Sequence, residues 1–367
     1  MSQWPLNQQH QPHHQPHVGH IHVNHRLTGE CWAPWHDLTH CVVGTCVTEH
    51  YFDGVRDAKV REPLRQMLRE TTEDLDNLAR TIQSMGVTVI RPPQDDALRL
   101  NIRRPQSMVQ PVETTPRDMA TQIGPHTVYR SQRDRGLMGA WLGAVDVNAI
   151  DSAWFELLSL PLVVEPPCWT QVGDRLIVDL QQYRLPSAEQ ELIAWGERWL
   201  PGVTVLPIDA GCHIDGWFQC IKPGVILTCA VNEDLHIFDE TFPGWQIHQV
   251  EGIHAHKAPQ MQFYGGQKNN YWLPNAKNNF NVQRFIQDYL LGWTGVASES
   301  VFEVNSLMVN DHTMIACQDN ESVRTWLKSH GVEMVVCPLR HRWFWDGGIS
   351  CFTLAVGRKG PSLQKYI

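Results

Sequence analysis

Apolar positions along the chain recur in a strand, helix, strand order. Residues 61–85 carry apolar side chains at near-helical spacing, which predicts a long amphipathic helix that ends at Gly86. Short apolar runs at 41–44 and 87–90 lie on either side of this helix and predict buried strands. The pattern therefore predicts an α/β fold.

The same order returns further along the chain. The copies are 175–178, 187–200 and 202–207, then 307–316, 322–329 and 331–338, and more loosely 224–227 with 244–247. Copies of one unit indicate radial or stacked repetition of a module. Their uneven spacing leaves two architectures open, a closed α/β ring and a doubly wound sheet. No glycine-rich phosphate-binding motif follows these strands, which argues against a nucleotide site.

Composition narrows the class of protein. The chain has 367 residues, of which 42% are hydrophobic and 19% are charged, enough for one large domain or two ordinary ones. A net charge of −9 argues against nucleic acid as a partner, because phosphate binding needs a basic surface. No apolar stretch reaches membrane-spanning length, and the N-terminus lacks the order of a secretion signal. We therefore expect no membrane partner and a cytoplasmic location.

The first 29 residues differ from the rest in composition. They are rich in Gln, Pro and His, and predict a disordered tail before a single domain at 30–367. The spacing of the tail's histidines defines no coordination geometry, so no metal site is assigned. Ten cysteines are scattered over the chain without a CxxC pair, which favours free thiols in a reducing cytosol.

Cys351 is a candidate nucleophile. Gly347 and Gly348 allow a tight turn and a close approach to a ligand, and the thiol then precedes a predicted strand at 352–356. A lone cysteine in such a place is more often a small buried apolar side chain. Nucleophilic chemistry needs a histidine and carboxylates folded around the thiol.

Residues 211–216 supply such partners, because they contain His213 and Asp215. In a strand, side chains two residues apart point to the same face, so we expect these two in a shared site. Taken alone, His213 also fits a core histidine or half of a metal pair. Asp118 follows Pro-Arg and, taken alone, fits a capping residue of a turn or helix.

Together these motifs resemble the arginine:glycine amidinotransferases of the guanidino-group-modifying (pentein) superfamily. The resemblance extends from about residue 35 to the C-terminus. The segments that carry it are 35–44, 72–75, 86–89, 116–118, 213–215, 222–227, 304–309, 347–353 and 358–366. It implies a five-bladed α/β propeller with pseudo-fivefold repeats and an active site in the central channel. The ending at 358–366 resembles the transferases more than the related deiminases.

The resemblance also implies a mechanism. Asp118 and Asp215 would hold the guanidinium of arginine by charge-assisted hydrogen bonds. Cys351 as thiolate would attack the guanidino carbon, and His213 would give a proton to the departing ornithine. An amidino-thioether on Cys351 would then transfer its amidino group to a primary amine such as glycine, giving guanidinoacetate by ping-pong kinetics. No metal or organic cofactor is expected.

One departure from the family concerns the residue that orients the histidine. The family uses an Asp before a short strand, and alignment places Cys168 at that position. A thiol is a weak acceptor, and losing such an orienting group costs orders of magnitude in rate. Glu165 is the candidate replacement, although the two prolines between Glu165 and Cys168 stiffen the segment. A slow enzyme and a repurposed site are the other readings.

Three functions therefore remain open. The first is an amidinotransferase, and the second is a hydrolase or deiminase of the same superfamily, in which water replaces the amine. The third is a catalytically impaired guanidino-binding homologue. Residues 228–232 lack the arginine that binds the donor carboxylate in the family, so that contact is not assigned. The expected partners are small molecules, and a homodimer is left open.

Overall fold

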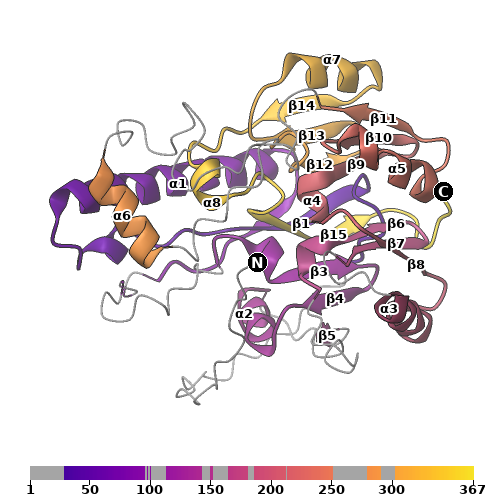
Figure 1. Ribbon diagram of the computed structural model, residues 1–367, viewed down its shortest axis with the longest axis horizontal. Helices are drawn as coiled ribbons and strands as arrows, with labels where there is room; N and C mark the ends of the chain where they lie inside the picture. Colours follow the sequence, from indigo (N-terminus) through magenta and orange to yellow (C-terminus); the bar gives the residue numbers. More distant parts are fainter. Residues whose placement is uncertain are drawn as a thin grey trace.

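The computed structural model describes residues 29–95, 97, 100, 113–142, 149–151, 164–180, 186–211, 213–250, 279–290 and 302–367. Except for Gly29, the predicted N-terminal tail lies outside the described residues. The described chain is an α/β protein in which small sheets lie between peripheral helices (Figure 1).

Five three-stranded sheets are present in the described residues, and all share one internal pattern. The middle strand of each sheet pairs antiparallel with one neighbour and parallel with the other. The sheets are β15-β1-β2, β3-β4-β5, β6-β7-β8, β9-β10-β11 and β12-β13-β14. The strands are β1 (Asp37–Val43), β2 (Thr88–Ile90), β3 (Ala120–Ile123), β4 (His126–Tyr129), β5 (Ala149–Asp151), β6 (Trp169–Val172), β7 (Arg175–Asp179), β8 (Thr204–Ile208), β9 (Phe218–Lys222), β10 (Val225–Thr228), β11 (Gln246–Gln249), β12 (Leu307–Asn310), β13 (Thr313–Ala316), β14 (Glu333–Val336) and β15 (Thr353–Lys359).

A helix follows the middle strand of every sheet and leads to the parallel strand. These helices are α1 (Ala58–Ser84), α2 (Gln132–Leu142), α3 (Pro186–Trp199), α5 (His236–Thr241) and α7 (Glu321–Ser329). The predicted strand, helix, strand order is confirmed, and each unit has an additional antiparallel strand. The remaining elements are α4 (Ile214–Trp217), α6 (Phe280–Tyr289) and α8 (Arg342–Trp345), with 3-10 turns η1 (Glu49–Phe52), η3 (Pro116–Asp118), η5 (Pro166–Cys168) and η7 (Asn232–Asp234).

The last strand completes the first sheet. β15 pairs antiparallel with β1, so that Cys41 faces Ala355 and Val43 faces Thr353. This pairing brings the segment before β15, which carries Cys351, back to the start of the described fold. Sequence-distant residues therefore meet at the ends of the short strands.

Helix α1 shows why the apolar pattern folds as it does. Asp57 caps the N-terminus of the helix, because its side chain accepts a hydrogen bond from the Lys59 backbone N–H at 2.9 Å. Gly86 follows the helix with φ of +83°, a left-handed conformation that glycine adopts without strain. Six apolar side chains on one face are fully buried, each contributing about 2 kcal/mol by removal from water. They are Leu64, Met67, Leu68, Leu75, Leu78 and Ile82.

Two hydrophobic clusters hold the segments that carry the candidate site. Ile349 and Phe352, on either side of Cys351, belong to the cluster built on α1 and α6. Ile214 and Trp217 of α4 belong to the cluster built on β9, β10 and α7. None of the helices in the described part of the chain has the length and apolar character that a bilayer crossing requires. No disulfide joins the nine cysteines that the structure describes.

Candidate active site

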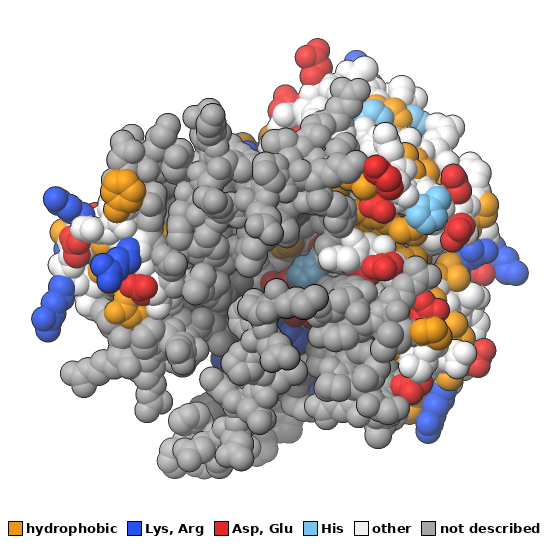
Figure 2. Space-filling model, viewed as in Figure 1, with side chains coloured by type: hydrophobic (Ala, Val, Ile, Leu, Met, Phe, Trp, Pro, Cys, Tyr) orange, Lys and Arg blue, Asp and Glu red, His pale blue; other side chains and the backbone are white. Residues whose placement is uncertain are grey.

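His213 and Glu165 form a hydrogen-bonded pair. The His213 Nε2 atom lies 2.8 Å from Glu165 Oε2, and the two side chains are 38% and 49% exposed. His213 lies in extended backbone directly before α4, and Glu165 lies directly before η5. In Figure 2, a histidine side chain lies beside acidic side chains near the centre of the face shown.

The expectation that His213 and Asp215 lie in one strand is wrong. Ile214–Trp217 form the short helix α4, and the strand β9 begins only at Phe218. Asp215 is therefore in the first helical turn, while His213 precedes the helix. The same-face argument for a strand therefore does not apply, although the charge of Asp215 still acts on His213.

Glu165 and Cys168, at the two ends of η5, lie in different surroundings. The 3-10 turn η5 places the Cys168 side chain inside, with no exposed surface, in a cluster with Val164, Trp169 and Val178. Glu165 stays outside this turn and reaches His213. The carboxylate that hydrogen-bonds His213 therefore comes from Glu165, three residues before the position that alignment favoured.

The charges around His213 favour its protonated form. Burial alone would lower the pKa of His213, but the Glu165 hydrogen bond and the negative charges of Asp118 and Asp215 outweigh it and raise the pKa to about 9. In return, the hydrogen bond with His213 holds the pKa of Glu165 below its usual value, although burial opposes this. At neutral pH the pair is thus an imidazolium and a carboxylate.

Asp118 belongs to the same group of charges. It ends the 3-10 turn η3, and Thr115 donates a side-chain hydrogen bond to it. Burial raises the pKa of Asp118, the His213 charge lowers it, and the nearby Asp215 and Glu165 raise it further. The side chain is thus a half-buried carboxyl group among like charges, and an added cation would favour its ionised form.

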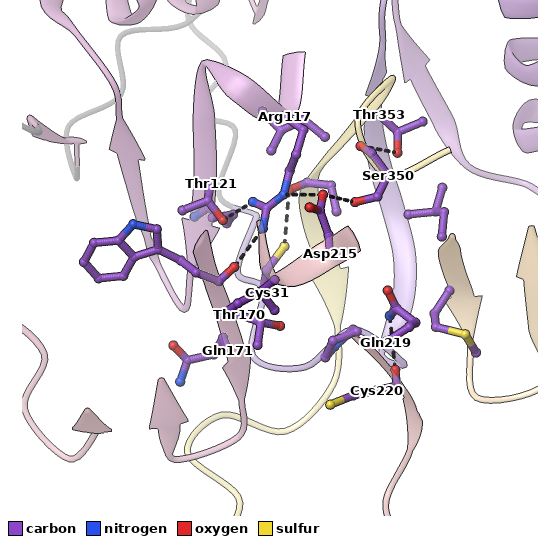
Figure 3. A pocket seen from close by; sticks show the side chains of 18 of the residues that line it. Cys31, Arg117, Thr121, Thr170, Gln171, Asp215, Gln219, Cys220, Ser350 and Thr353 are labelled. Atoms are coloured by element: carbon purple, nitrogen blue, oxygen red, sulfur yellow. Dashed lines mark hydrogen bonds and ion pairs between the residues drawn. The ribbon is translucent and has the colours of Figure 1, made fainter. Parts of the chain in front are cut away.

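Asp215 connects α4 to the segment that carries Cys351. The Ser350 hydroxyl donates a hydrogen bond to Asp215 Oδ2 at 2.7 Å. Arg117 Nε lies 3.6 Å from the same oxygen, and its guanidinium also donates to the Trp169 carbonyl at 2.7 Å (Figure 3). The other oxygen, Asp215 Oδ1, is buried and has no hydrogen-bond partner in the described residues.

Cys351 lies in the turn between α8 and β15 and is 5% exposed. The glycines before it serve packing within the protein. A Cβ atom at Gly347 would lie 2.8 Å from the Cys351 Cβ, and one at Gly348 would lie 2.5 Å from the Asn305 carbonyl oxygen. Cys351 Sγ accepts a hydrogen bond from Asn305 Nδ2 at 3.1 Å. Asn305 was not expected from the sequence, because its contact with Cys351 spans 46 residues.

A cavity of about 120 Å³ lies beside this group. Arg117, Asp215 and Ser350 line it, together with Cys31 and Gln171 (Figure 3). Cys351 and His213 are not among its lining residues, so the cavity is next to the candidate nucleophile and does not contain it. Asp215 is the predicted site residue that borders it.

Four of the predicted site residues are linked by contacts and charges, while Cys168 lies apart in its apolar cluster. Glu165 contacts His213, the charges of Asp118 and Asp215 act on His213, and Ser350 ties Asp215 to the segment that carries Cys351. In the described residues, no cluster of three or more histidine, cysteine or carboxylate side chains is arranged to hold a metal ion.

Comparison with known proteins gives the fold. No family model matches the sequence, and a search of curated proteins found no match. Among solved structures, the inosamine-phosphate amidinotransferase from Streptomyces griseus is 17% identical, with a TM-score of 0.59 over 92% of this chain and 99% of that one. An amidinotransferase of the saxitoxin biosynthetic pathway from Microseira wollei is 16% identical, with a TM-score of 0.57 over 93% and 100%.

Hydrolases share the same fold. A dimethylarginine dimethylaminohydrolase from Pseudomonas aeruginosa, solved with citrulline, is 12% identical, with a TM-score of 0.53 over 87% of this chain and 99% of that one. The chain therefore has the α/β fold of these pentein proteins. The resemblance to amidinotransferases seen in the sequence is found again in the fold.

Proposed function

We propose that the protein is an amidinotransferase built on a five-bladed α/β propeller. Five sheets with one internal pattern, and a last strand that completes the first sheet, support five blades around a central site. The observation that carries the function is the His213–Glu165 pair, which lies among two further carboxylates and is connected through Ser350 to the Cys351 segment.

The charge of this site suits a guanidinium donor. The three acidic groups Glu165, Asp118 and Asp215 outnumber the two cations His213 and Arg117, so the site favours an added cation. A guanidinium is a planar monocation whose N–H groups pair with carboxylates. The unpartnered Asp215 Oδ1 and the half-buried Asp118 are acceptors for those N–H groups. Arginine is the donor that this arrangement fits.

The first half-reaction places a covalent bond on Cys351. Its thiolate attacks the guanidino carbon and forms a C–S bond. The bond from that carbon to the substituted nitrogen then breaks, and the His213 imidazolium gives its proton to the departing ornithine amine. The product on the enzyme is an amidino-thioether, and His213 is left neutral.

The second half-reaction reverses these roles. A primary amine, such as that of glycine, attacks the amidino carbon and gives a proton to neutral His213. The C–S bond breaks, the thiolate of Cys351 is restored, and guanidinoacetate leaves when glycine is the acceptor. Glu165 holds the imidazole in place through both steps and stabilises its charged form.

Hydrolysis is the second candidate function. Hydrolases share this fold with TM-scores close to those of the transferases, and water could take the place of the amine at the same intermediate. The difference lies in which nucleophile reaches the amidino carbon.

Product analysis separates these candidates. The purified chain is incubated with arginine, with and without glycine and other primary amines, and the products are identified by mass spectrometry. Ornithine with guanidinoacetate supports transfer, and citrulline with ammonia, or ornithine with urea, supports hydrolysis. Binding of arginine without any turnover would contradict both and leave a guanidino-binding protein. Cys351→Ser is the control that should stop turnover while the fold is retained.

A further inference from the structure

Asn305 holds Cys351 at two points. The side-chain amide donates from Nδ2 to Cys351 Sγ at 3.1 Å, and Oδ1 accepts from the Cys351 backbone N–H at 3.2 Å. Asn305 lies two residues before β12 begins and is 1% exposed. A rigid, water-excluded amide thus contacts both the main chain and the sulfur of the candidate nucleophile.

The orientation of this amide is determined by its partners. A backbone N–H can only donate, so the atom that faces Cys351 N must be the amide oxygen. The Nδ2 group must then face the sulfur. A flipped amide would place two donors against each other at the Cys351 backbone. The geometry therefore directs a hydrogen-bond donor at Cys351 Sγ.

The main chain around Cys351 is packed against the same residue. Ser350 N lies 3.5 Å from the Asn305 carbonyl oxygen, to which it donates. A side chain at Gly348 would collide with Asn305, because its Cβ would lie 2.5 Å from that carbonyl oxygen. The glycine therefore lets the turn come close enough for the amide to reach the sulfur.

We propose that Asn305 is a positioning residue that fixes the side chain of Cys351 and favours its thiolate form by donating a hydrogen bond to the sulfur. The assignment of Cys351 as nucleophile rests on the proposed function. The thiolate gains more from this donor than the thiol does, because a hydrogen bond to a charged acceptor is about twice as strong as a neutral one. Asn305 thereby prepares the nucleophile before any substrate is bound.

Alkylation of Cys351 tests this without turnover. Trypsin cleavage after Arg342 and Arg358 releases residues 343–358, in which Cys351 is the single cysteine. The intact, folded chain is labelled with iodoacetamide at a series of pH values and then digested. Mass spectrometry of this peptide gives the rate of labelling at each pH. For the unsubstituted protein, we expect the midpoint of labelling to lie below about pH 8.5, the ordinary value for cysteine.

Asn305→Asp is the sharpest variant, because it keeps an acceptor for Cys351 N–H and replaces the donor with a carboxylate. We expect labelling at neutral pH to slow about tenfold or more, and the midpoint to move up by at least about one pH unit. Asn310→Asp is the matched control, since Asn310 Oδ1 caps only the turn at His312 N. It should leave labelling of Cys351 unchanged.

Asn305→Ala keeps the test decisive if the Asp variant does not fold, since it removes the donor without adding charge. Unchanged labelling in a folded Asn305 variant would overturn the proposal, and so would a midpoint at or above about pH 8.5 in the unsubstituted protein. Labelling uses neither arginine nor an amine, so its failure is distinguishable from failure of the amidinotransferase proposal.

Discussion

The Ser350 hydroxyl donates to Asp215 Oδ2 over 2.7 Å, and this contact ties the segment before β15 to helix α4. One residue after Ser350 is Cys351, and two residues before Asp215 is His213. This hydrogen bond therefore connects the segment that carries the candidate nucleophile to the segment that carries the candidate acid, although the two residues are 138 positions apart in the sequence. The apolar neighbours of Ser350 and of Asp215 along the chain belong to two different hydrophobic clusters, each of which holds one half of the site.

The pH dependence of activity tests the role of Glu165. The proton donor is the His213 imidazolium, whose pKa of about 9 means that the charged form is present below this pH and lost above it. We expect kcat/KM for arginine to fall as the pH rises through about 9. In Glu165→Gln, loss of the ion pair should move this decline toward the ordinary histidine value of about 6.5.

We measure kcat/KM from about pH 6 to pH 10 and expect the alkaline decline in Glu165→Gln to lie at least about one pH unit lower than in the unsubstituted protein. Glu62→Gln is the control, because Glu62 pairs with Arg61 on the surface of α1 at 2.9 Å. An alkaline limb that stays in place in the Glu165 variant would contradict the assignment of Glu165 as the partner of His213.

Asp118 is predicted to bind the donor. Asp118→Asn keeps the size of the side chain and removes a charged acceptor for the guanidinium. The loss of one charge-assisted hydrogen bond, about 1.5–3 kcal/mol, should lower kcat/KM for arginine by about 10- to 100-fold. The temperature of thermal unfolding should stay nearly unchanged or rise slightly, because burial and like charges already disfavour the ionised form of Asp118.

The control for Asp118 is Asp319→Asn, which removes the surface pair with Arg324 at 2.8 Å. If kcat/KM for arginine is the same in the Asp118 variant and in this control, Asp118 does not bind the donor.

Cys168→Asp should not speed the reaction. Glu165 already holds His213, and Cys168 is fully buried among apolar side chains. A carboxyl group placed there should lower the free energy of unfolding by about 3 kcal/mol. Cys168→Ala serves as the size control, and both are compared by thermal unfolding and by kcat. A faster Asp variant would show that residue 168 does orient the histidine.

The regular elements could be predicted because their signals are local. The apolar spacing and terminal glycine of α1 placed the helix at 61–85, and the structure has it at Ala58–Ser84. Likewise α3 and α7 begin and end within one residue of the expected positions. The hairpin partners β3 and β6 carry short, mixed patterns and were not recognised as part of a repeated unit.

The contacts between the site residues could not be predicted from local sequence patterns, because they depend on tertiary structure. Alignment with the amidinotransferase family placed Cys168 at the position of the orienting Asp, but η5 turns Cys168 inward and leaves Glu165 outside. The two prolines begin this turn, where their fixed φ is favourable and a missing N–H costs little. The stiffness expected to hinder Glu165 therefore helps to present it. The segment with His213 and Asp215 is too short for its pattern of apolar and polar residues to distinguish a strand from a helical turn.

The most direct test is a search for the covalent intermediate on Cys351. The chain is mixed with arginine in the absence of an acceptor amine, quenched with acid and digested with trypsin. The amidinotransferase account predicts that the peptide 343–358 gains the mass of one amidino group, with release of ornithine, and that added glycine removes this mass as guanidinoacetate forms. Turnover of arginine while Cys351 stays unmodified, or turnover by Cys351→Ser, would contradict it.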